Sequence, residues 1–294
     1  MASARDIKRR IRGVKNIQQV TRAMNMIAAA RLRRAQLKAE SARPYADKLI
    51  QILRDIGGSG LSMKHPLLEK REVKKVGILL VTSDRGLCGA FNANVIREAA
   101  QFANKQTVPV VVTIVGRKGA DYFRRREFEV AHTFPQPSRE LRLEELGAIS
   151  KTVITDYGQA KYDQLLLCYT RFVSVVRYPP TLIQLLPLEP EKTKAEKKES
   201  DAPKNAFQFE PLAEEILGAL LPRYIEVLIY RALVESFTSE QASRMIAMKN
   251  ATDSAKDMIQ ILTKKYNNAR QGRITKELLE VVSGAEAMKA AHKG

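Results

Sequence analysis

The stretch ARDIKRRIRGVKNIQQVTRAMNMIAAARLRRAQLKAE, residues 4–40, decides how the chain begins. Its large apolar residues recur at helical spacings, and no proline precedes Pro44. We therefore predict one amphipathic helix over residues 1–56, ended by the glycine-rich run at 57–60. At about 1.5 Å per residue, such a helix would be on the order of 80 Å long. The residues expected on its apolar stripe are Ile7, Ile11, Val14, Ile17, Met24, Ile27 and Leu32.

The same stretch holds much of the positive charge of the chain. The 294 residues include 50 Lys and Arg against 32 Asp and Glu, a formal net charge of +18. Between Arg5 and Asp55 there are 14 basic residues against four acidic ones, so more than half of the excess lies in this segment. A charge of this size implies an acidic partner, and the candidates are nucleic acid, anionic lipid or an acidic protein surface.

Composition excludes several classes of protein. The hydrophobic share of 45% and the charged share of 28% are ordinary for a globular chain. No apolar run approaches the roughly 18 to 20 residues that cross a bilayer, and no signal-peptide pattern follows the basic N-terminus. Only Cys88 and Cys168 occur, which indicates a reducing compartment, and three scattered histidines argue against a histidine metal site. We expect no cofactor and no bound metal.

Residues 73–188 change from helical spacing to short apolar runs separated by amphipathic stretches. This alternation is typical of an α/β layer, so we predict a central Rossmann-like α/β domain with a largely parallel sheet. The expected strands are 76–82, 108–115, 128–134 and 164–172, with 182–188 as a further candidate. The expected helices are 92–104, 118–126 and 140–160.

Residues 189–206 mix Lys, Glu, Pro and Ser without a large apolar residue, so we interpret them as a flexible linker or loop. Helical periodicity then returns, and we predict a second long helix in 207–294, with Pro222 as a possible kink. Two long amphipathic helices bury their stripes most simply by packing antiparallel as a coiled coil, so the two ends should form one rod. The C-terminal helix is longer, and its last turns should project with small and apolar residues exposed.

Four blocks of sequence resemble the gamma subunits of F-type (bacterial-type) ATP synthases. They are IKRRI with TRAM at 7–11 and 21–24, SDRGLCGAFN at 83–92, RMIAMKNATD at 244–253 and ITKELLEVVSGAEA at 274–287. The blocks occur in the family order and span the whole chain, so as a set they are specific.

The resemblance implies a central rotor shaft inside a ring of three alpha and three beta subunits. It implies contacts with an epsilon subunit and with a membrane c-ring, and a location on the cytoplasmic face of the bacterial cell membrane as a peripheral subunit. The family couples ion flow through the membrane ring to ATP synthesis or hydrolysis by rotation. The gamma chain itself is implied to be non-catalytic, with no transmembrane segment of its own and no nucleic-acid partner.

The resemblance also implies contact residues for the acidic lever loop of beta. The basic candidates share an expected exposed position, and they are Lys8, Arg9, Arg10, Arg33, Arg34 and Arg85. For each of them, an ordinary solvated basic face is the alternative. Met24 matches a family position near the same lever, although a methionine that fills an uneven seam explains it more simply.

Two further contacts follow from the resemblance. Arg270 and Gln271 match the contact with a beta catch loop, and Thr275 and Glu277 are expected on the same side of the helix, unless they only maintain the shaft geometry. Phe207, Phe209 and Glu210 match the foot that sits on the membrane ring. Many relatives carry Tyr where this chain has Phe209, so Glu210 is the better polar candidate.

Two other functions compete with the rotor. A basic helical nucleic-acid-binding protein would use the N-terminal charge against phosphates, but the chain has no Trp and no known reading module. An enzyme built on the α/β layer would need a catalytic constellation, and only isolated Asp84 and Asp121 are available. The loop around Cys88 lacks both glycine-rich phosphate motifs, and Asp84 would oppose an anion.

Overall fold

The computed structural model describes residues 4–58, 65–137, 143–188 and 213–291. A long helix begins the chain and another ends it: α1 runs over Ala4–Gly58 and α5 over Ala213–Ala291. Pro44 and Pro222 lie inside these helices, so neither proline ends its helix. The chain divides into two compact units, one formed by residues 1–28 with 245–294 and the other by 29–244. The second unit holds the sheet.

The sheet has five strands in the order β3-β2-β1-β4-β5. The first four are parallel, and β5 is antiparallel to β4. The strands are β1 Val76–Val81, β2 Val110–Val115, β3 Glu129–Phe134, β4 Gln164–Thr170 and β5 Pro180–Leu186. Three helices lie between them: α2 Phe91–Lys105, α3 Arg117–Arg124 and α4 Leu143–Gly158. The predicted fold class, a central Rossmann-like α/β domain with a long helix at each end of the chain, is confirmed.

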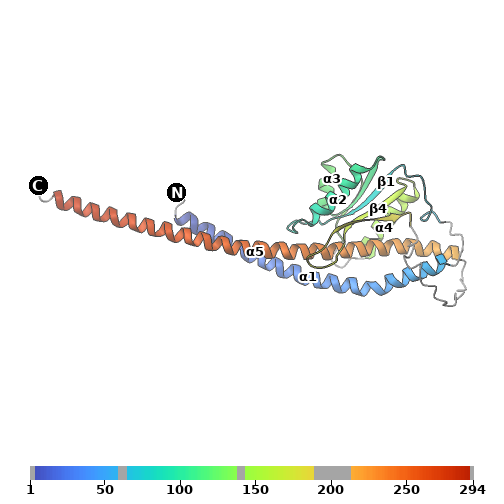
Figure 1. Ribbon diagram of the computed structural model, residues 1–294, viewed down its shortest axis with the longest axis horizontal. Helices are drawn as coiled ribbons and strands as arrows, with labels where there is room; N and C mark the ends of the chain where they lie inside the picture. Colours follow the sequence, from blue (N-terminus) through green and yellow to red (C-terminus); the bar gives the residue numbers. More distant parts are fainter. Residues whose placement is uncertain (1–3, 59–64, 138–142, 189–212, 292–294) are drawn as a thin grey trace, which may run out of the picture. The chain divides into compact units, whose positions relative to one another are not determined.

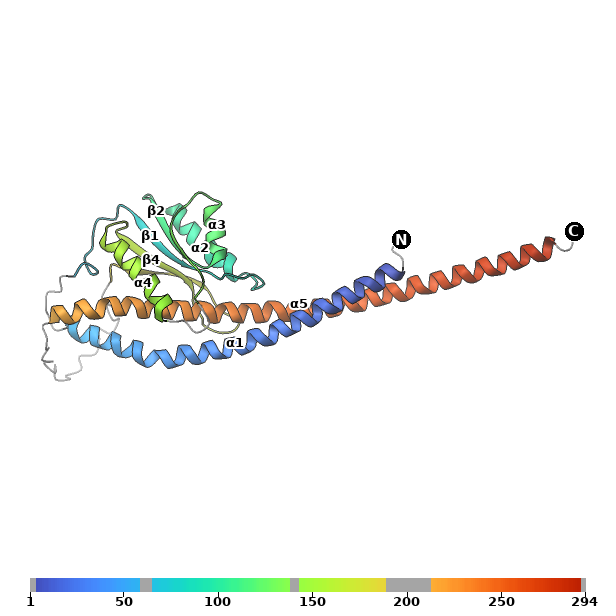
Figure 2. The ribbon, with the colours of Figure 1, turned by 180° about the vertical axis from the view of Figure 1, so that it is seen from behind.

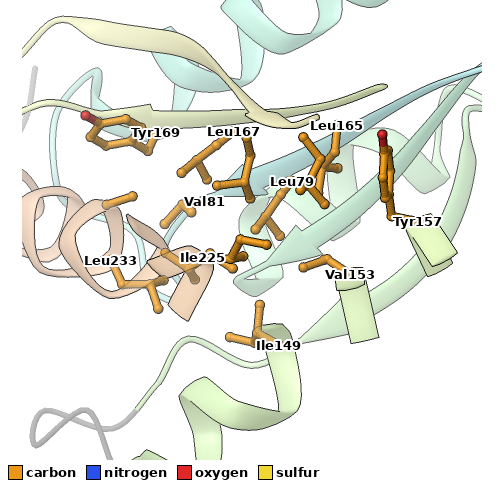
Figure 3. Packing of buried hydrophobic residues seen from close by; sticks show 14 of the residues in the cluster. Leu79, Val81, Ile149, Val153, Tyr157, Leu165, Leu167, Tyr169, Ile225 and Leu233 are labelled. Carbon is orange, nitrogen blue, oxygen red and sulfur yellow. The ribbon is translucent and has the colours of Figure 1, made fainter. Parts of the chain in front are cut away.

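Helices lie on both sides of the sheet (Figures 1 and 2), and each face of the sheet has its own apolar core. Successive side chains of a strand point to opposite faces, so Ile78 and Leu80 of β1 pack with α2 and α3, whereas Leu79 and Val81 pack with α4 and α5. Figure 3 shows the second core, in which β1 and β4 meet α4 and α5. Burial on both faces explains why the sequences of β1, β2 and β4 are nearly continuous apolar runs, whereas the edge strand β3 alternates between exposed and half-buried residues.

The first part of α5 belongs to this second core. Leu221, Ile225, Ile229 and Leu233 are buried at a spacing of four residues, and they form one cluster with the sheet. The predicted coiled-coil helix over 207–294 assigns this stretch to the seam of a two-helix shaft. In the structure, this stretch covers the sheet instead.

The other unit is an antiparallel pair of helices with a heptad seam. Buried or half-buried positions alternate at spacings of four and three along both helices. They are residues 7, 11, 14, 18, 21, 25 and 28 of α1, and residues 248, 252, 255, 259, 262, 266 and 269 of α5. The predicted apolar stripe is therefore correct for Ile7, Ile11 and Val14 but wrong for Ile17 and Ile27, which are 57% and 50% exposed.

Candidate interaction surfaces

Polar contacts hold the second half of the two-helix seam. The amide Nδ2 of Asn25 donates to the carbonyl oxygen of Met245 at 2.7 Å, and the hydroxyls of Thr21 and Thr252 lie 2.8 Å apart. As residue numbers fall along α1 they rise along α5, so the pair is antiparallel, as predicted. A polar residue in a coiled-coil seam fixes the register at some cost in stability. The seam is thus specific in its pairing and only modestly apolar.

A second apolar stripe runs beside this seam on α1. Ile17, Val20, Met24 and Ile27 follow one another at spacings of three, four and three, each one position away from a seam residue. Met24 is half-buried, while Ile17, Val20 and Ile27 are 57%, 58% and 50% exposed. Apolar residues with a heptad spacing and without cover are suited to pack against a further protein segment. We refer to these four residues as the α1 stripe.

The basic candidates on α1 are exposed, as the lever contact requires. Lys8, Arg9 and Arg10 lie in the two-helix unit, and Arg9 pairs with Asp6 at 3.1 Å. Arg33 and Arg34 are exposed within the sheet-containing unit. Exposed charges of this kind attract an opposite surface without fixing it, because each pair contributes only about 0 to 1 kcal/mol.

The last part of α5 extends past the start of α1 within the two-helix unit. Thr21 lies beside Thr252, and the two helices are antiparallel. Ala4, seventeen residues before Thr21, is therefore level with Ala269, seventeen residues after Thr252. Every described side chain from 270 to 285 is exposed. The apolar ones recur at helical spacings, and they are Ile274, Leu278, Leu279, Val281 and Val282. The predicted projecting tip with exposed apolar residues is therefore present.

The catch candidates lie at the start of this exposed part. Arg270, Gln271, Thr275 and Glu277 are all exposed, but they do not share one side of the helix. Residues two apart project about 200° from each other, so Thr275 and Glu277 point in nearly opposite directions, and the expectation of a common side was wrong. Gln271 and Thr275 share one face, while Glu277 lies with Arg270 and pairs with Arg273 at 3.3 Å.

Arg85 is presented by a loop that its own bonds hold rigidly. The hydroxyl of Ser83 donates to the carbonyl oxygen of Arg85 at 2.7 Å, and the side chain of Asn92 accepts from the amide of Ser83 at 3.0 Å. Leu87 follows in the left-handed region, with φ 61°, and is 64% exposed. A non-glycine residue in this conformation persists only where its surroundings fix it.

Those surroundings are a buried polar stripe on α5. Ser236, Ser239, Glu240, Ser243 and Arg244 recur at spacings of three and one and are all buried. The hydroxyls of the first two bond to the amide and carbonyl of the last residue of β4, at 3.2 and 3.3 Å. The hydroxyl of Ser243 donates to the carbonyl oxygen at position 88, at 2.6 Å. We call these five residues the α5 clamp.

An ion pair completes the clamp. Arg244 Nη1 and Glu240 Oε1 are 2.6 Å apart, with both side chains at least 92% buried. Arg244 also donates to the carbonyl oxygen of Gly86 at 3.3 Å, and the amide of Gln136 donates to the second oxygen of Glu240. The loop at 83–89, the segment after β3 and α5 are thereby joined. Sequence analysis missed the clamp because a helix face of Ser, Glu and Arg usually faces solvent.

The geometry of the loop does not suit a phosphate. Asp84 Oδ1 accepts the backbone N–H of Arg117 at 2.8 Å, so a carboxylate already occupies the N-terminus of α3. Cys88 is buried, and its burial raises the pKa of the thiol, which disfavours the reactive thiolate. The phosphate-binding and reactive-thiol interpretations of this loop therefore have no structural support.

Several expectations fall outside these surfaces. Phe207, Phe209 and Glu210 of the foot lie outside the described residues, as does the linker at 189–206. Among the residues with described positions, no group of His, Cys, Asp and Glu could hold a metal ion. No described helix is both long and apolar enough to span a bilayer.

Known proteins similar to this chain share one description. A family model described as ATP synthase matches residues 3–288. The ATP synthase gamma chain of Desulforamulus reducens is 42% identical over 288 residues, which cover 98% of this chain and 100% of that relative. The gamma chain of Pelotomaculum thermopropionicum is 43% identical over 288 residues, with the same coverage of both chains.

Solved structures of ATP synthases share the fold. A chain from the Euglena gracilis mitochondrial enzyme, a structure of OSCP/F1/c-ring in rotational state 3, superimposes with a TM-score of 0.71 at 19% identity, covering 99% of this chain and 96% of that chain. A chain from the central stalk/c-ring of the Tetrahymena thermophila enzyme gives a TM-score of 0.58 at 25% identity, covering 79% and 99%.

Proposed function

This chain belongs to the ATP synthase gamma chain family, and from that premise we propose how its surfaces serve rotation. It is the central rotor shaft of an F-type ATP synthase, which couples ion flow through a membrane ring to ATP synthesis or hydrolysis. The gamma chain is a non-catalytic subunit. Its partners are the alpha and beta subunits, the epsilon subunit and the c-ring, and nothing among the comparisons supports the nucleic-acid-binding alternative.

The observation that carries the mechanism is the uneven surface of the two-helix unit. A shaft can bias three equivalent sites only if it contacts them differently, because a partner that binds all states equally shifts no population. Around this unit, the α1 stripe is apolar, the turn bearing Lys8, Arg9 and Arg10 is basic, and the faces of α5 beyond Ala269 differ from one another. Each rotary position would therefore offer a given beta subunit a different surface.

For the lever contact we propose basic residues in each unit. In the two-helix unit, Lys8, Arg9 and Arg10 would attract the acidic lever of beta, with the α1 stripe, including Met24, as their apolar counterpart. In the sheet-containing unit, Arg33, Arg34 and Arg85 would attract it. Weak exposed pairs suit a contact that must form and break in each turn. The clamp supports the choice of Arg85, because it holds that loop in a fixed conformation.

For the catch contact we propose two faces of α5. Gln271 and Thr275 would hydrogen-bond a catch loop of beta, while Arg270 would pair with a carboxylate on the neighbouring face. Glu277 already pairs with Arg273, so its role would be to keep that arginine in place. Phe207, Phe209 and Glu210 stay proposed contacts of the foot with the membrane ring, on the strength of the family resemblance.

A reconstitution tests both the function and these residues. The purified chain is mixed with alpha and beta subunits, and assembly and ATP hydrolysis are measured. Arg270→Ala with Gln271→Ala should impair assembly or turnover, whereas the matched exposed pair Asn267→Ala with Asn268→Ala should not. A chain that never enters an active complex would overturn the function, and equal tolerance of both pairs would overturn only the catch assignment.

For the location we propose the cytoplasmic face of a bacterial cell membrane. The chain is a peripheral component of the F1 part of the enzyme, and its family resemblance supports this face. Cell fractionation with and without a membrane wash at low ionic strength tests it, since a peripheral subunit should be released with the other F1 subunits.

A further inference from the structure

The hairpin between β4 and β5 ends in an exposed apolar turn. The backbone amide of Val173 donates to the carbonyl oxygen of Arg177 at 3.2 Å, and Ser174 and Arg177 exchange backbone bonds at 2.9 and 3.2 Å. These bonds close a four-residue turn with Val175 and Val176 at its centre. Val176 is 81% exposed, and Val173 is 51% exposed. We call residues 171–179 the hairpin tip.

Nothing in the hairpin itself explains these valines. The centres of tight turns favour Gly, Pro, Asn, Asp and Ser, because these residues suit the backbone or bond to it. A β-branched side chain is stiff and offers the turn no hydrogen bond. Of the two central valines, Val175 is half-buried and Val176 is exposed. The exposed Val176, with Val173 beside the turn, costs solubility without stabilising the fold, which indicates a surface that another molecule covers.

Cations flank the apolar turn. Arg171 and Arg177 are exposed at its two sides, and neither forms a salt bridge with a described carboxylate. Their guanidinium groups are thus available to carboxylates of another molecule. The chemistry of the hairpin tip fits an acidic segment that also offers an apolar socket.

The hairpin tip emerges beside the loop that carries Arg85. β1 and β4 are parallel neighbours, with Leu80 opposite Cys168, so the segments that follow both strands leave the same edge of the sheet. Adjacent strands lie about 4.8 Å apart, close enough for one partner segment to touch both. The α5 clamp holds both as well: Ser236 and Ser239 bond to the last residue of β4, and Arg244 bonds to the loop.

We propose that the hairpin tip is a second prong of the contact made by the Arg85 loop. Val173 and Val176 insert into an apolar socket, Arg171 and Arg177 pair with carboxylates beside it, and the segment they meet is the acidic segment of beta that meets Arg85. This inference rests on the proposed rotor function, because that function places beta at this edge of the sheet. Two points of contact would fix the position of the beta segment on this edge of the sheet, which a single contact with Arg85 could not do.

Photo-crosslinking in the assembled complex tests the second prong. Val176→Cys in the full chain is labelled with benzophenone maleimide, assembled with alpha and beta subunits, and irradiated. The two native cysteines are buried, and burial raises the pKa of both thiols, so the label should go to position 176. We expect an adduct with an acid-rich peptide of beta. Val73→Cys, an exposed valine before the opposite end of β1, should give no such adduct.

Arg85→Cys carries the same label as a reference. If the Arg85 position crosslinks to beta but position 176 crosslinks to alpha or to nothing, the second prong is wrong and the proposed function stands. If no labelled chain enters an active complex, the function itself fails. As an independent measure, Val173→Ser with Val176→Ser should weaken binding to the ring by about tenfold, through lost apolar burial, with the melting temperature of the free chain unchanged. Unchanged binding would also overturn the proposal.

Discussion

The buried ion pair of the α5 clamp predicts that removing one of its two charges destabilises the fold more than removing both. Arg244 and Glu240 are 8% and 3% exposed, and their charged atoms are 2.6 Å apart. Arg244→Met leaves a buried carboxylate with only the amides of Gln136 and Gln241 as partners. Leaving one charge of a buried pair uncompensated typically costs about 3 to 5 kcal/mol. We expect a loss of that size in the free energy of unfolding.

The double variant Glu240→Leu with Arg244→Met removes both charges. It gives up the hydrogen bonds to Gly86 and Gln136, each worth about 1 kcal/mol, and the longer one to Gln241, but it leaves no unpaired charge. Replacing a whole buried pair by apolar residues of similar volume is often neutral or stabilising. The double variant should therefore lose about 1 to 2 kcal/mol, less than the single variant.

Urea unfolding of the full chain, followed by near-ultraviolet circular dichroism, measures these losses. The chain has no Trp, and Tyr157 and Tyr162 are fully buried in the core that α5 covers, so the signal reports on that unit. Arg231→Met is the matched control, since Arg231 pairs with Glu235 on the same helix at 2.9 Å but is 56% exposed. Its cost should stay below about 1 kcal/mol. Equal losses in the single and double variants would refute the reasoning.

Two further predictions concern the sheet. Gly116→Ala should destabilise the chain by about 2 kcal/mol or more, because φ is 97° and the new Cβ would clash with the carbonyl oxygen of Thr82. Thermal melting measures this loss, and the control Gly147→Ala, in open space on α4, should stabilise the chain slightly. Burial raises the pKa of Cys168 from 9.0 to about 12, so the folded state holds the thiol proton more tightly than the unfolded state does. The contribution of this thiol to the free energy of unfolding is therefore complete below pH 9 and is lost as the pH rises above 9. Cys168→Ala should make the pH dependence of stability flatter between pH 9 and 10.5, and an unchanged slope would contradict the burial argument.

The centre of the sheet could be predicted because its three inner strands, β1, β2 and β4, are buried on both faces. The run at Val76–Val81 is apolar at every position, and turn residues bound it, so its type and limits are visible in the sequence. The edge strand β5 was the least certain, and it is also the only one of the five that runs antiparallel, with a shifted register beside Leu165. Parallel order followed from the alternation of strands and helices.

The seam of the two-helix unit could not be read from apolar spacing alone. From position 18 onward, its members on α1 are Gln18, Thr21, Asn25 and Ala28, while the larger apolar residues lie one position away. A pattern search selects the α1 stripe as the buried face, because it scores side chains by hydrophobicity and ignores what the partner helix offers. Thr252 and the carbonyl of Met245 are what make a polar seam possible, and they are more than 200 residues away.

The α5 clamp could not be predicted either, because its hydrogen-bond partners are also distant in the sequence. Ser236, Ser239 and Ser243 have few apolar atoms, and their burial is favourable only because backbone groups of β4 and of the loop at 83–89 accept or donate hydrogen bonds to them. Such partners come from the tertiary fold. The family resemblance pointed to the region, through the blocks at 83–92 and 244–253, without saying that the two blocks touch.

The exposed apolar residues of the two-helix unit are physically reasonable only in an assembly. The α1 stripe and the apolar residues of α5 beyond Ala269 would each be costly in water if they stayed bare, and the polar seam between the helices offers little apolar burial to offset that cost. A ring that surrounds such a unit can cover these residues in turn, without any one contact becoming strong enough to stop rotation. The basic residues add attraction that salt screens and water weakens. Apolar groups outside the seam therefore suit a shaft, because they can be buried against partner subunits in the assembly instead of stabilising the isolated chain.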